Sequence, residues 1–303
     1  MVSISASRGP ARGEQRRPAA SARPYRILRR PDRSWGVRAL LIVTDLDGSL
    51  LDESYGFEPA RPALAALADA SAGLVLASSK TRAEMEPLAA RLGLRTPLIV
   101  ENGGAILMPC REGGWEPVAR GVAHAHLRRA LAEIALEAGA AVRGFSSLGV
   151  DAVARLTGLD ADGARLALAR DHDEPFVLAD EMRAPALAAA AERRGLRVTR
   201  GGRFFHLTGD TDKGRAFRQL LSLVAPPRGT VGLGDALNDL PLLEAVDRPI
   251  LIPRPDGTLE PALAAALPHA EVAPAAGPVG WNIAVTTVLG GGRLPTVSGG
   301  DAA

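Results

Sequence analysis

A short apolar run that ends in two carboxylates constrains the fold of this chain most. Leu40 to Val43 has the uninterrupted hydrophobicity of a parallel strand covered on both faces, and Asp45-Leu-Asp47-Gly48 follows it. In open α/β sheets, ligands bind beyond the carboxyl ends of such strands, so Asp45 is expected at a crevice. Alternation along a strand puts Asp45 and Asp47 on one side. Two adjacent carboxylates repel, and a divalent cation or a raised pKa relieves that repulsion.

After this strand, strand and helix patterns alternate, which predicts a parallel sheet with helices on both faces. The core strands are expected at 40–45, 74–77, 98–100, 204–208, 230–234 and 249–252, and the core helices at 58–70, 81–91, 213–224, 240–245 and 281–289. Thr81, with Glu84 three residues later, has the spacing of a helix-opening capping box.

Residues 105–200 have a different pattern. Short strand-like pieces alternate there with helical segments, at 105–108, 124–138, 142–145, 151–156, 160–169, 175–178, 184–193 and 196–199. We therefore expect an α/β fold with a Rossmann-like core, residues 39–104 and 201–289, and an inserted α+β cap domain, residues 105–200.

Composition limits the class of protein. The chain has 303 residues and 47% hydrophobic content, enough to bury the cores of two domains. Its single cysteine, Cys110, excludes an intrachain disulfide and a cysteine-rich zinc site, so a cytoplasmic protein is expected. No run of 18 apolar residues occurs, so we expect no membrane partner.

Both ends of the chain have the composition of disordered tails. Residues 1–38 carry ten arginines against Glu14 and Asp32, so the pI of about 9.1 belongs to this tail. A tether to an anionic surface or nucleic acid is the functional alternative, but disorder is the simpler interpretation, and no nucleic-acid partner is expected. Residues 290–303, rich in Gly and Pro, are expected to be disordered too.

Four polar clusters fall where strands are expected to end. They are Asp45 with Asp47, Ser78, Lys213, and Asp235-x-x-Asn238-Asp239. Phosphoryl transfer through a covalent intermediate needs a carboxylate nucleophile, a second carboxyl group to protonate the leaving oxygen, and a hydroxyl and an ammonium for the phosphoryl oxygens. Hard oxygen ligands without a His/Cys cluster indicate Mg²⁺. Each cluster alone could have a purely structural explanation, such as a turn or a solvated lysine. Their combination in this order favours an enzyme.

The same residues resemble the motifs of the haloacid dehalogenase-like phosphatases. More narrowly, five segments between residues 39 and 288 are similar to the mannosyl-3-phosphoglycerate phosphatase family: Ser78-Ser-Lys-Thr-Arg-Ala-Glu84, Glu101-Asn-Gly-Gly-Ala-Ile106, Arg203-Phe-Phe-His206, Asp212-Lys-Gly214 and Gly277-Pro-Val-Gly-Trp-Asn282. The resemblance implies that Asp45 is the nucleophile and Asp47 the general acid/base. Ser49 stands where the family more often has Thr, and the hydroxyl is kept.

The resemblance also implies how the site is divided. Asp45, the backbone carbonyl of Asp47 and Asp235 would hold Mg²⁺, with Asp239 in support, while Ser78 and Lys213 would bind the phosphoryl group. Three further residues are weaker candidates for substrate contact: Arg203, His206 and Asn238. A solvated Arg203 and a His206 that satisfies a buried hydrogen bond are the alternatives.

The implied reaction is the Mg²⁺-dependent dephosphorylation of 2-O-mannosyl-3-phosphoglycerate to mannosylglycerate through a phosphoaspartate. The expected partner is thus a small phosphorylated glycosyl-glycerate, and the oligomeric state stays open. A glucosyl-3-phosphoglycerate phosphatase or another phosphosugar phosphatase is the nearest alternative. A receiver-like phosphoacceptor domain needs neither Asp47 nor a long insertion, and a non-catalytic sugar-phosphate binder would tolerate losses among the site residues, none of which is missing.

Overall fold

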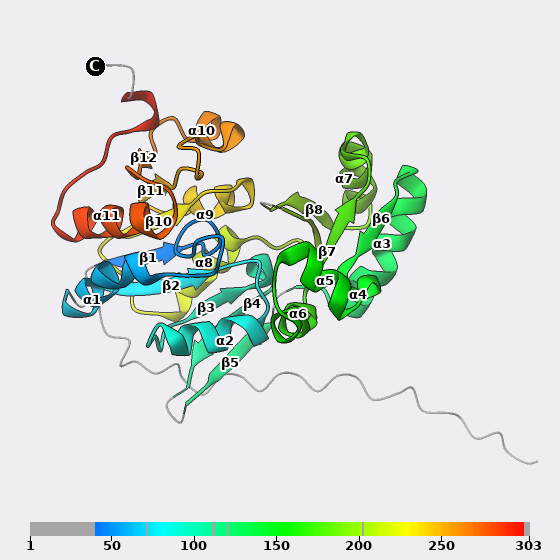
Figure 1. Cartoon of the computed structure of the whole chain (residues 1–303), viewed down its shortest axis with the longest axis horizontal. Coiled ribbons are helices and arrows are strands. Elements are labelled where there is room, and N and C mark those ends of the chain that lie inside the picture. The colour runs from blue at the N-terminus through cyan, green and yellow to red at the C-terminus, as the bar shows by residue number, and fades with distance from the viewer. Residues whose placement is uncertain (1–39, 71, 111–112, 120, 202, 300–303) are drawn as a thin grey trace, which may run out of the picture. The chain divides into compact units, whose positions relative to one another are not determined.

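The computed structural model describes residues 40–70, 72–110, 113–119, 121–201 and 203–299 (Figure 1). The Arg-rich tail expected at residues 1–38 lies outside these residues. Within them, no helix is long and apolar enough to cross a membrane.

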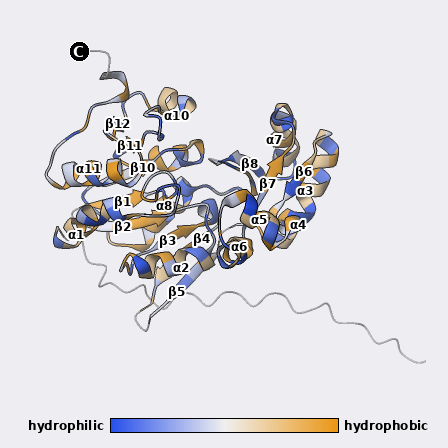
Figure 2. Ribbon diagram, viewed as in Figure 1, coloured by the Kyte–Doolittle hydropathy of each residue, from blue (hydrophilic) through white to orange (hydrophobic). Residues whose placement is uncertain are grey.

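The larger sheet contains eight strands among the described residues, in the order β12-β11-β10-β1-β2-β3-β4-β5. Their bounds are β1 Leu41–Thr44, β2 Gly73–Ala77, β3 Leu98–Val100, β4 Ala105–Pro109, β5 Trp115–Ala119, β10 Thr230–Gly234, β11 Arg248–Leu251 and β12 Glu271–Val272. β1 lies centrally and pairs in parallel with both β2 and β10. Figure 2 shows hydrophobic residues along β2 and β3, as expected for strands covered on both faces.

Helices cover both faces of this sheet. They are α1 Arg61–Asp69, α2 Arg82–Arg91, α8 Lys213–Leu223, α9 Leu240–Leu243, α10 Pro261–Ala266 and α11 Gly277–Leu289. Within β1, Ile42 belongs to an apolar cluster that includes residues of α1, α2 and α11. Leu41 and Val43 belong to a second cluster with α8 and α9, because side chains alternate along a strand. This confirms the predicted Rossmann-like core. The capping box of Thr81 and Glu84 is also confirmed at the start of α2.

The second sheet has four strands in the part of the chain that the structure describes, ordered β6-β7-β9-β8 and paired antiparallel throughout. The strands of this sheet and the helices of the same part of the chain are α3 His124–Ala138, β6 Val142–Gly144, α4 Phe145–Leu148, α5 Val150–Thr157, α6 Ala161–Leu168, β7 Asp173–Leu178, α7 Ala184–Glu192, β8 Arg197–Arg200 and β9 Phe205–Thr208. Leu127 of α3, Phe176 of β7 and Leu187 of α7 share its main apolar cluster. We call residues 124–208 the cap.

Two predicted strands belong to the other sheet. The strand expected at 105–108 in the cap is β4, which pairs antiparallel with β3 in the large sheet and continues into β5. The strand expected at 204–208 in the core is β9, which pairs with β7 and β8 in the cap. Both errors have one cause, since the apolar pattern of a strand predicts that it is buried but does not identify its neighbours.

The C-terminal segment also differs from the prediction of a disordered tail. Residues 290–299 are described, and Leu294 donates its backbone N–H to Oε2 of Glu271 at 2.8 Å. Arg248 binds the same carboxylate through two hydrogen bonds of 2.9 Å, and Val297 donates its backbone N–H to the Ala270 carbonyl at 3.0 Å. Glu271 is 3% exposed, so a buried carboxylate fixes this segment despite its turn-rich composition. Residues 300–303 lie outside the described part.

Candidate active site

The carboxyl ends of the central strands bring the predicted clusters together. Asp45 follows β1, Ser78 follows β2 and Asp235 follows β10, and these three strands are parallel neighbours. Lys213 is the first residue of α8. Residues far apart in sequence therefore meet at one edge of the sheet, where ligands bind in folds of this type.

Lys213 is a buried ammonium between two carboxylates. Its side chain is 1% exposed, and Nζ donates to Oδ1 of Asp45 at 2.5 Å and to Oδ1 of Asp239 at 2.6 Å. Burial disfavours the charged lysine, but Asp239 and Asp45 outweigh that effect and raise its pKa. Lys213 is therefore a fixed positive charge at the site, and a solvated lysine at this position is excluded.

Three carboxylates form the acidic part of the site. Asp45, Asp235 and Asp239 each offer an oxygen, and these atoms lie within 4.8 Å of one another. Burial and the neighbouring Asp239 raise the pKa of Asp45 to about 7. Burial and the Asp45 carboxylate likewise raise the pKa of Asp235 well above its ordinary value. The donors are hard oxygens whose mutual repulsion a divalent cation relieves, so the residues fit Mg²⁺.

The loop after β1 supports this acidic cluster. Ser49, which stands where the resembled family more often has Thr, donates its hydroxyl to Oδ1 of Asp235 at 3.1 Å. Gly48 has a φ of +82°, and a Cβ there would lie 2.5 Å from Oδ2 of Asp235. Glycine is required at this position for both reasons. Oδ2 of Asp239 accepts the backbone N–H groups of Asp235 and Ala236, which closes the turn after β10.

Asp47 has a different environment from the acidic cluster. Its side chain is 45% exposed, and Oδ1 lies 2.9 Å from Nζ of Lys80, whose side chain is 12% exposed. Burial disfavours the Lys80 charge, yet Asp47 and Glu84 raise its pKa. The predicted contact between the Asp47 carbonyl and the metal stays a prediction.

Ser78 is buried at the start of the loop between β2 and α2. Its hydroxyl accepts the backbone N–H of Lys80 at 3.2 Å, and its carbonyl accepts the backbone N–H of Asn102 at 3.0 Å. These contacts tie the loop to the edge of the sheet, next to the strand that precedes Asp45.

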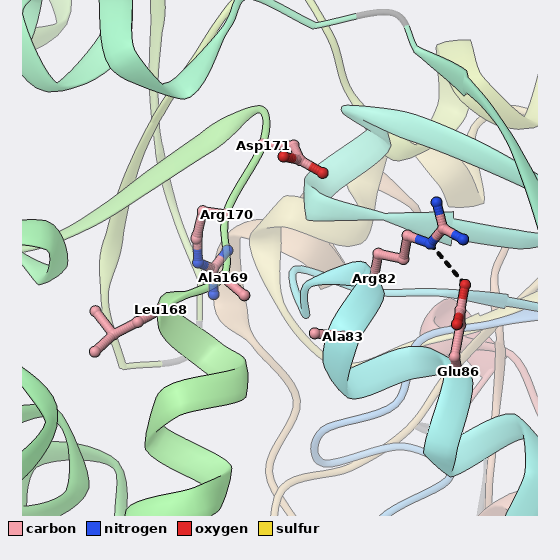
Figure 3. Close-up of a pocket in the computed structure, with 7 residues that line it drawn as sticks. All are labelled: Arg82, Ala83, Glu86, Leu168, Ala169, Arg170 and Asp171. Carbon is pink, nitrogen blue, oxygen red and sulfur yellow. Dashed lines mark hydrogen bonds and ion pairs between the residues drawn. The ribbon is translucent and has the colours of Figure 1, made fainter.

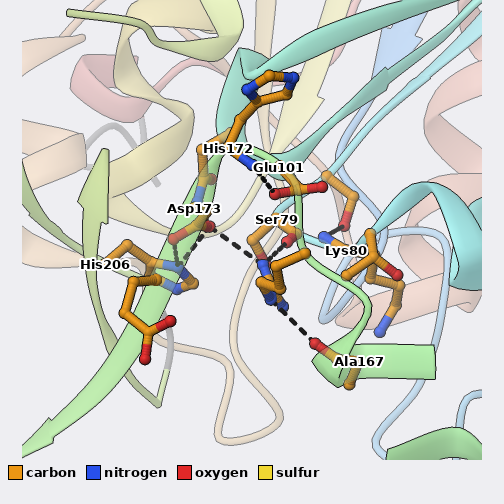
Figure 4. A network of polar contacts seen from close by, with 12 residues as sticks. Ser79, Lys80, Glu101, Ala167, His172, Asp173 and His206 are labelled. Atoms are coloured by element: carbon orange, nitrogen blue, oxygen red, sulfur yellow. Dashed lines mark hydrogen bonds and ion pairs between the residues drawn. The ribbon is translucent and has the colours of Figure 1, made fainter. Parts of the chain in front are cut away.

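A polar network joins the core to the cap around Asp173, the fully buried first residue of β7 (Figure 4). Its carboxylate accepts from Nδ2 of Asn102 at 3.0 Å, Nδ1 of His206 at 2.8 Å and Nη1 of Arg170 at 3.2 Å. Asn238 in turn donates to the side-chain oxygen of Asn102 at 3.2 Å. Of the two alternatives for His206, the structure therefore has the buried hydrogen bond.

Two further contacts reinforce this junction. Arg170 donates to the carbonyl of Ser79 at 2.8 Å, beside Ser78. The carboxylate of Glu101 accepts the backbone N–H groups of Asp171 and His172. The polar runs Glu101-Asn-Gly-Gly and Asp171-His-Asp-Glu can be found in the sequence. That the first contacts the second across the two domains is seen only in the structure.

We expect Asp173→Asn to destabilise the fold by about 3 kcal/mol, because Arg170 would be left buried without its carboxylate. Urea denaturation followed by circular dichroism measures this. Asp171→Asn is the matched control, since Asp171 is an exposed acid two residues earlier. Equal stabilities for the two variants would show that the buried carboxylate contributes nothing.

A pocket of about 500 Å³ lies at the junction of α2 and the end of α6 (Figure 3). It is lined by Arg82, Ala83, Glu86, Leu168, Ala169, Arg170 and Asp171. Arg82 and Glu86 are paired within it at 2.6 Å. None of its lining residues is a predicted site residue, so the pocket is separate from the carboxylates beyond β1 and β10.

Arg203 lies in the loop between β8 and β9 and is exposed. Its Nη2 donates to the hydroxyl of Tyr55 in the core at 3.1 Å. The structure thus places this weaker candidate at the boundary between cap and core.

Comparisons with known proteins agree with this geometry. A family model described as haloacid dehalogenase-like hydrolase matches residues 42–137. A glucosyl-3-phosphoglycerate/mannosyl-3-phosphoglycerate phosphatase of Methanococcoides burtonii is 38% identical over 267 residues, which cover 82% of this chain and 97% of the relative. A protein of the same name from Persephonella marina is 37% identical over 266 residues, with the same coverage.

A solved structure, a haloacid dehalogenase-like hydrolase from B. subtilis, has the same fold. Its TM-score is 0.61 at 17% identity, and the match covers 82% of this chain and 98% of that one. With the relatives above, this shows that the chain belongs to the haloacid dehalogenase-like hydrolase family. Within it, the predicted similarity to mannosyl-3-phosphoglycerate phosphatases is confirmed.

Proposed function

We propose that the chain hydrolyses 2-O-mannosyl-3-phosphoglycerate to mannosylglycerate and phosphate, with Asp45 as nucleophile and Mg²⁺ as cofactor. The family makes it a phosphoric monoester hydrolase, and both relatives carry the name of a glycosyl-3-phosphoglycerate phosphatase. The observation that carries the proposal is the arrangement of Asp45, Asp235 and Asp239 around Lys213.

The proposed first step transfers the phosphoryl group to Asp45. A carboxylate oxygen of Asp45 forms a bond to phosphorus while the bond from phosphorus to the ester oxygen breaks. Asp47 gives its proton to that leaving oxygen, which becomes a hydroxyl of mannosylglycerate. The separate environments of Asp45 and Asp47 support this division, because Asp45 lies inside the acidic cluster and Asp47 outside it.

The second step releases phosphate. Asp47, now ionised, takes a proton from water as the water oxygen attacks phosphorus, and the bond from phosphorus to the Asp45 oxygen breaks. Lys213 has three N–H donors and uses two for Asp45 and Asp239, so the third suits a phosphoryl oxygen. Ser78 would bind another such oxygen. Bound Mg²⁺ would neutralise charge between nucleophile and phosphate, held by Asp45, Asp235 and Asp239.

Other functions have less support. The glucosyl ester is the nearest alternative substrate, because the names of both relatives include it. The family and its phosphatase members argue against a receiver-like domain, and the complete set of site residues argues against a non-catalytic binder.

Phosphate release by the full chain tests the proposal. The substrates are the mannosyl and glucosyl esters of 3-phosphoglycerate, glucose 6-phosphate and p-nitrophenyl phosphate, each with Mg²⁺. A kcat/KM that is highest for the mannosyl ester supports the proposal. A preference for a phosphosugar without glycerate would refute the substrate assignment and leave the hydrolase class intact.

Magnesium binding should strengthen as pH rises. Because the pKa of Asp45 is raised to about 7, its carboxyl group is mostly neutral below that pH and binds a cation poorly. The Mg²⁺ affinity measured by calorimetry should therefore increase up to about tenfold per pH unit from pH 6 and level off near pH 8. Asp45→Asn should weaken this dependence, and EDTA should abolish turnover. An affinity that is independent of pH would contradict the expectation.

A further inference from the structure

Three side chains that the proposed reaction leaves without a role are linked to one another, and one of them contacts Asp47. Lys80 lies at the end of the loop from β2 to α2, and its Nζ is 2.9 Å from Asp47 and 4.4 Å from the centre of the Tyr55 ring. Tyr55 belongs to the loop between β1 and α1. Arg203 reaches the Tyr55 hydroxyl from the cap, 3.1 Å away. Two cations, one from each domain, therefore flank one aromatic ring.

Lysine is rare in this sequence. The chain has 34 arginines and two lysines, and each lysine contacts a carboxylate of the Asp45-Leu-Asp47 motif. Lys213 contacts Asp45, and Lys80 contacts Asp47. A compact ammonium group offers its charge from one point, so Lys80 can hold Asp47 and a second anion side by side.

The backbone around Tyr55 keeps the ring in place. Tyr55 has a φ of +60°, a conformation that costs free energy for a bulky side chain. The backbone N–H groups of Ser54 and Gly56 each donate to Asp52 at 2.8 Å and hold this turn. The turn thus keeps the ring against the Lys80 ammonium and its hydroxyl within reach of Arg203.

We place the leaving group of the substrate next to these cations. Asp47 protonates the leaving oxygen in the proposed reaction, so groups that touch Asp47 face the part of the substrate beyond that oxygen. In a 3-phosphoglycerate ester, an oxygen and two carbon atoms separate the carboxylate carbon from phosphorus. The substrate therefore carries a negative charge close to Lys80 and to the Tyr55 ring that Arg203 contacts.

We propose that Lys80 and Arg203 bind the carboxylate of the substrate and so select phosphomonoesters whose carboxylate is separated from the leaving oxygen by two carbon atoms. This inference rests on the proposed function of the same site. Arg203 gives one N–H to the Thr157 carbonyl at 3.0 Å and another to Tyr55, and its guanidinium group has five in all. A carboxylate on Lys80 shares the ammonium with Asp47 and so weakens its hold on Asp47, which lets Asp47 turn toward the leaving oxygen. Because one cation comes from each domain, carboxylate binding joins cap to core.

The test compares two substrates that differ only in this charge: 2-O-mannosyl-3-phosphoglycerate and its carboxamide. Lys80→Met and Arg203→Met should each lower kcat/KM for the carboxylate about 10 to 100-fold. For the carboxamide, Arg203→Met should change it less than about threefold, whereas Lys80→Met, which also removes the ion pair of Asp47, should lower it by a smaller factor than for the carboxylate. Lys80→Arg should restore part of the preference. Arg200→Met is the control, because Arg200 lies in the same hairpin but pairs with Glu181, and it should keep the full preference.

Equal losses on both substrates in both variants would overturn the proposal, because they would mean that these residues only support the structure. Arg203 is exposed, so its variant tests the idea even where Lys80→Met folds poorly. If wild-type protein hydrolyses no glycosyl-3-phosphoglycerate, the proposed function fails instead. The inference is then tested by comparing kcat/KM for 3-phosphoglycerate with that for glycerol 3-phosphate. A lack of preference for 3-phosphoglycerate overturns it.

Discussion

Asp45→Asn should reduce turnover on the order of 10⁴ to 10⁶-fold, the largest effect expected in this protein. A neutral amide is a poor nucleophile and a poor ligand for a hard cation, so one substitution removes both contributions. Phosphate release from 2-O-mannosyl-3-phosphoglycerate with Mg²⁺ measures the loss. In addition, no phosphorylated protein should be trapped when the reaction is quenched in acid.

The fold should survive this substitution. Lys213 keeps its contact with Asp239, and one carboxylate fewer lowers the repulsion within the cluster. Asp69→Asn is the matched control, because Asp69 is an exposed acid of the same domain at the end of α1. Its activity should equal that of the wild type. Substantial turnover by Asp45→Asn would refute the assignment of the nucleophile.

Asp47→Asn should lower kcat for the sugar ester about 10² to 10⁴-fold, the usual contribution of a general acid/base. The alkoxide leaving group depends on protonation, whereas p-nitrophenolate leaves without it. With p-nitrophenyl phosphate, the variant should therefore release a burst of nitrophenol and then slow down, since water attack on the phosphoaspartate still lacks its base. Stopped-flow absorbance measures this burst.

Glu53→Gln is the control for Asp47→Asn. It also replaces a carboxylate by an amide, at an exposed position six residues further along. It should have no burst and no loss of activity. A loss below about tenfold on the sugar ester, or equal losses on both substrates without a burst, would exclude Asp47 as the proton donor.

Much of the core was predictable from local sequence. The apolar run before Asp45 predicted a buried parallel strand, and the capping box at Thr81 and Glu84 predicted where α2 begins. Both features depend on neighbouring residues, so a short segment contains the required information. Parallel strands also end at one edge of the sheet, and this rule was enough to group Asp45, Ser78 and Asp235.

Tertiary structure alone decided the features that depend on distant partners. Residues 105–108 and 205–208 both form buried strands, yet one pairs with β3 and the other with β7. Likewise, Lys80 and Arg203 resemble ordinary solvated cations until the fold places Lys80 over the ring of Tyr55 and Arg203 at its hydroxyl. The physical reason is that periodicity determines which side of an element is buried, whereas its neighbour is chosen by packing over the whole chain. The sequence by itself therefore determined which polar residues gather beyond the strands, and the fold decided what surrounds them.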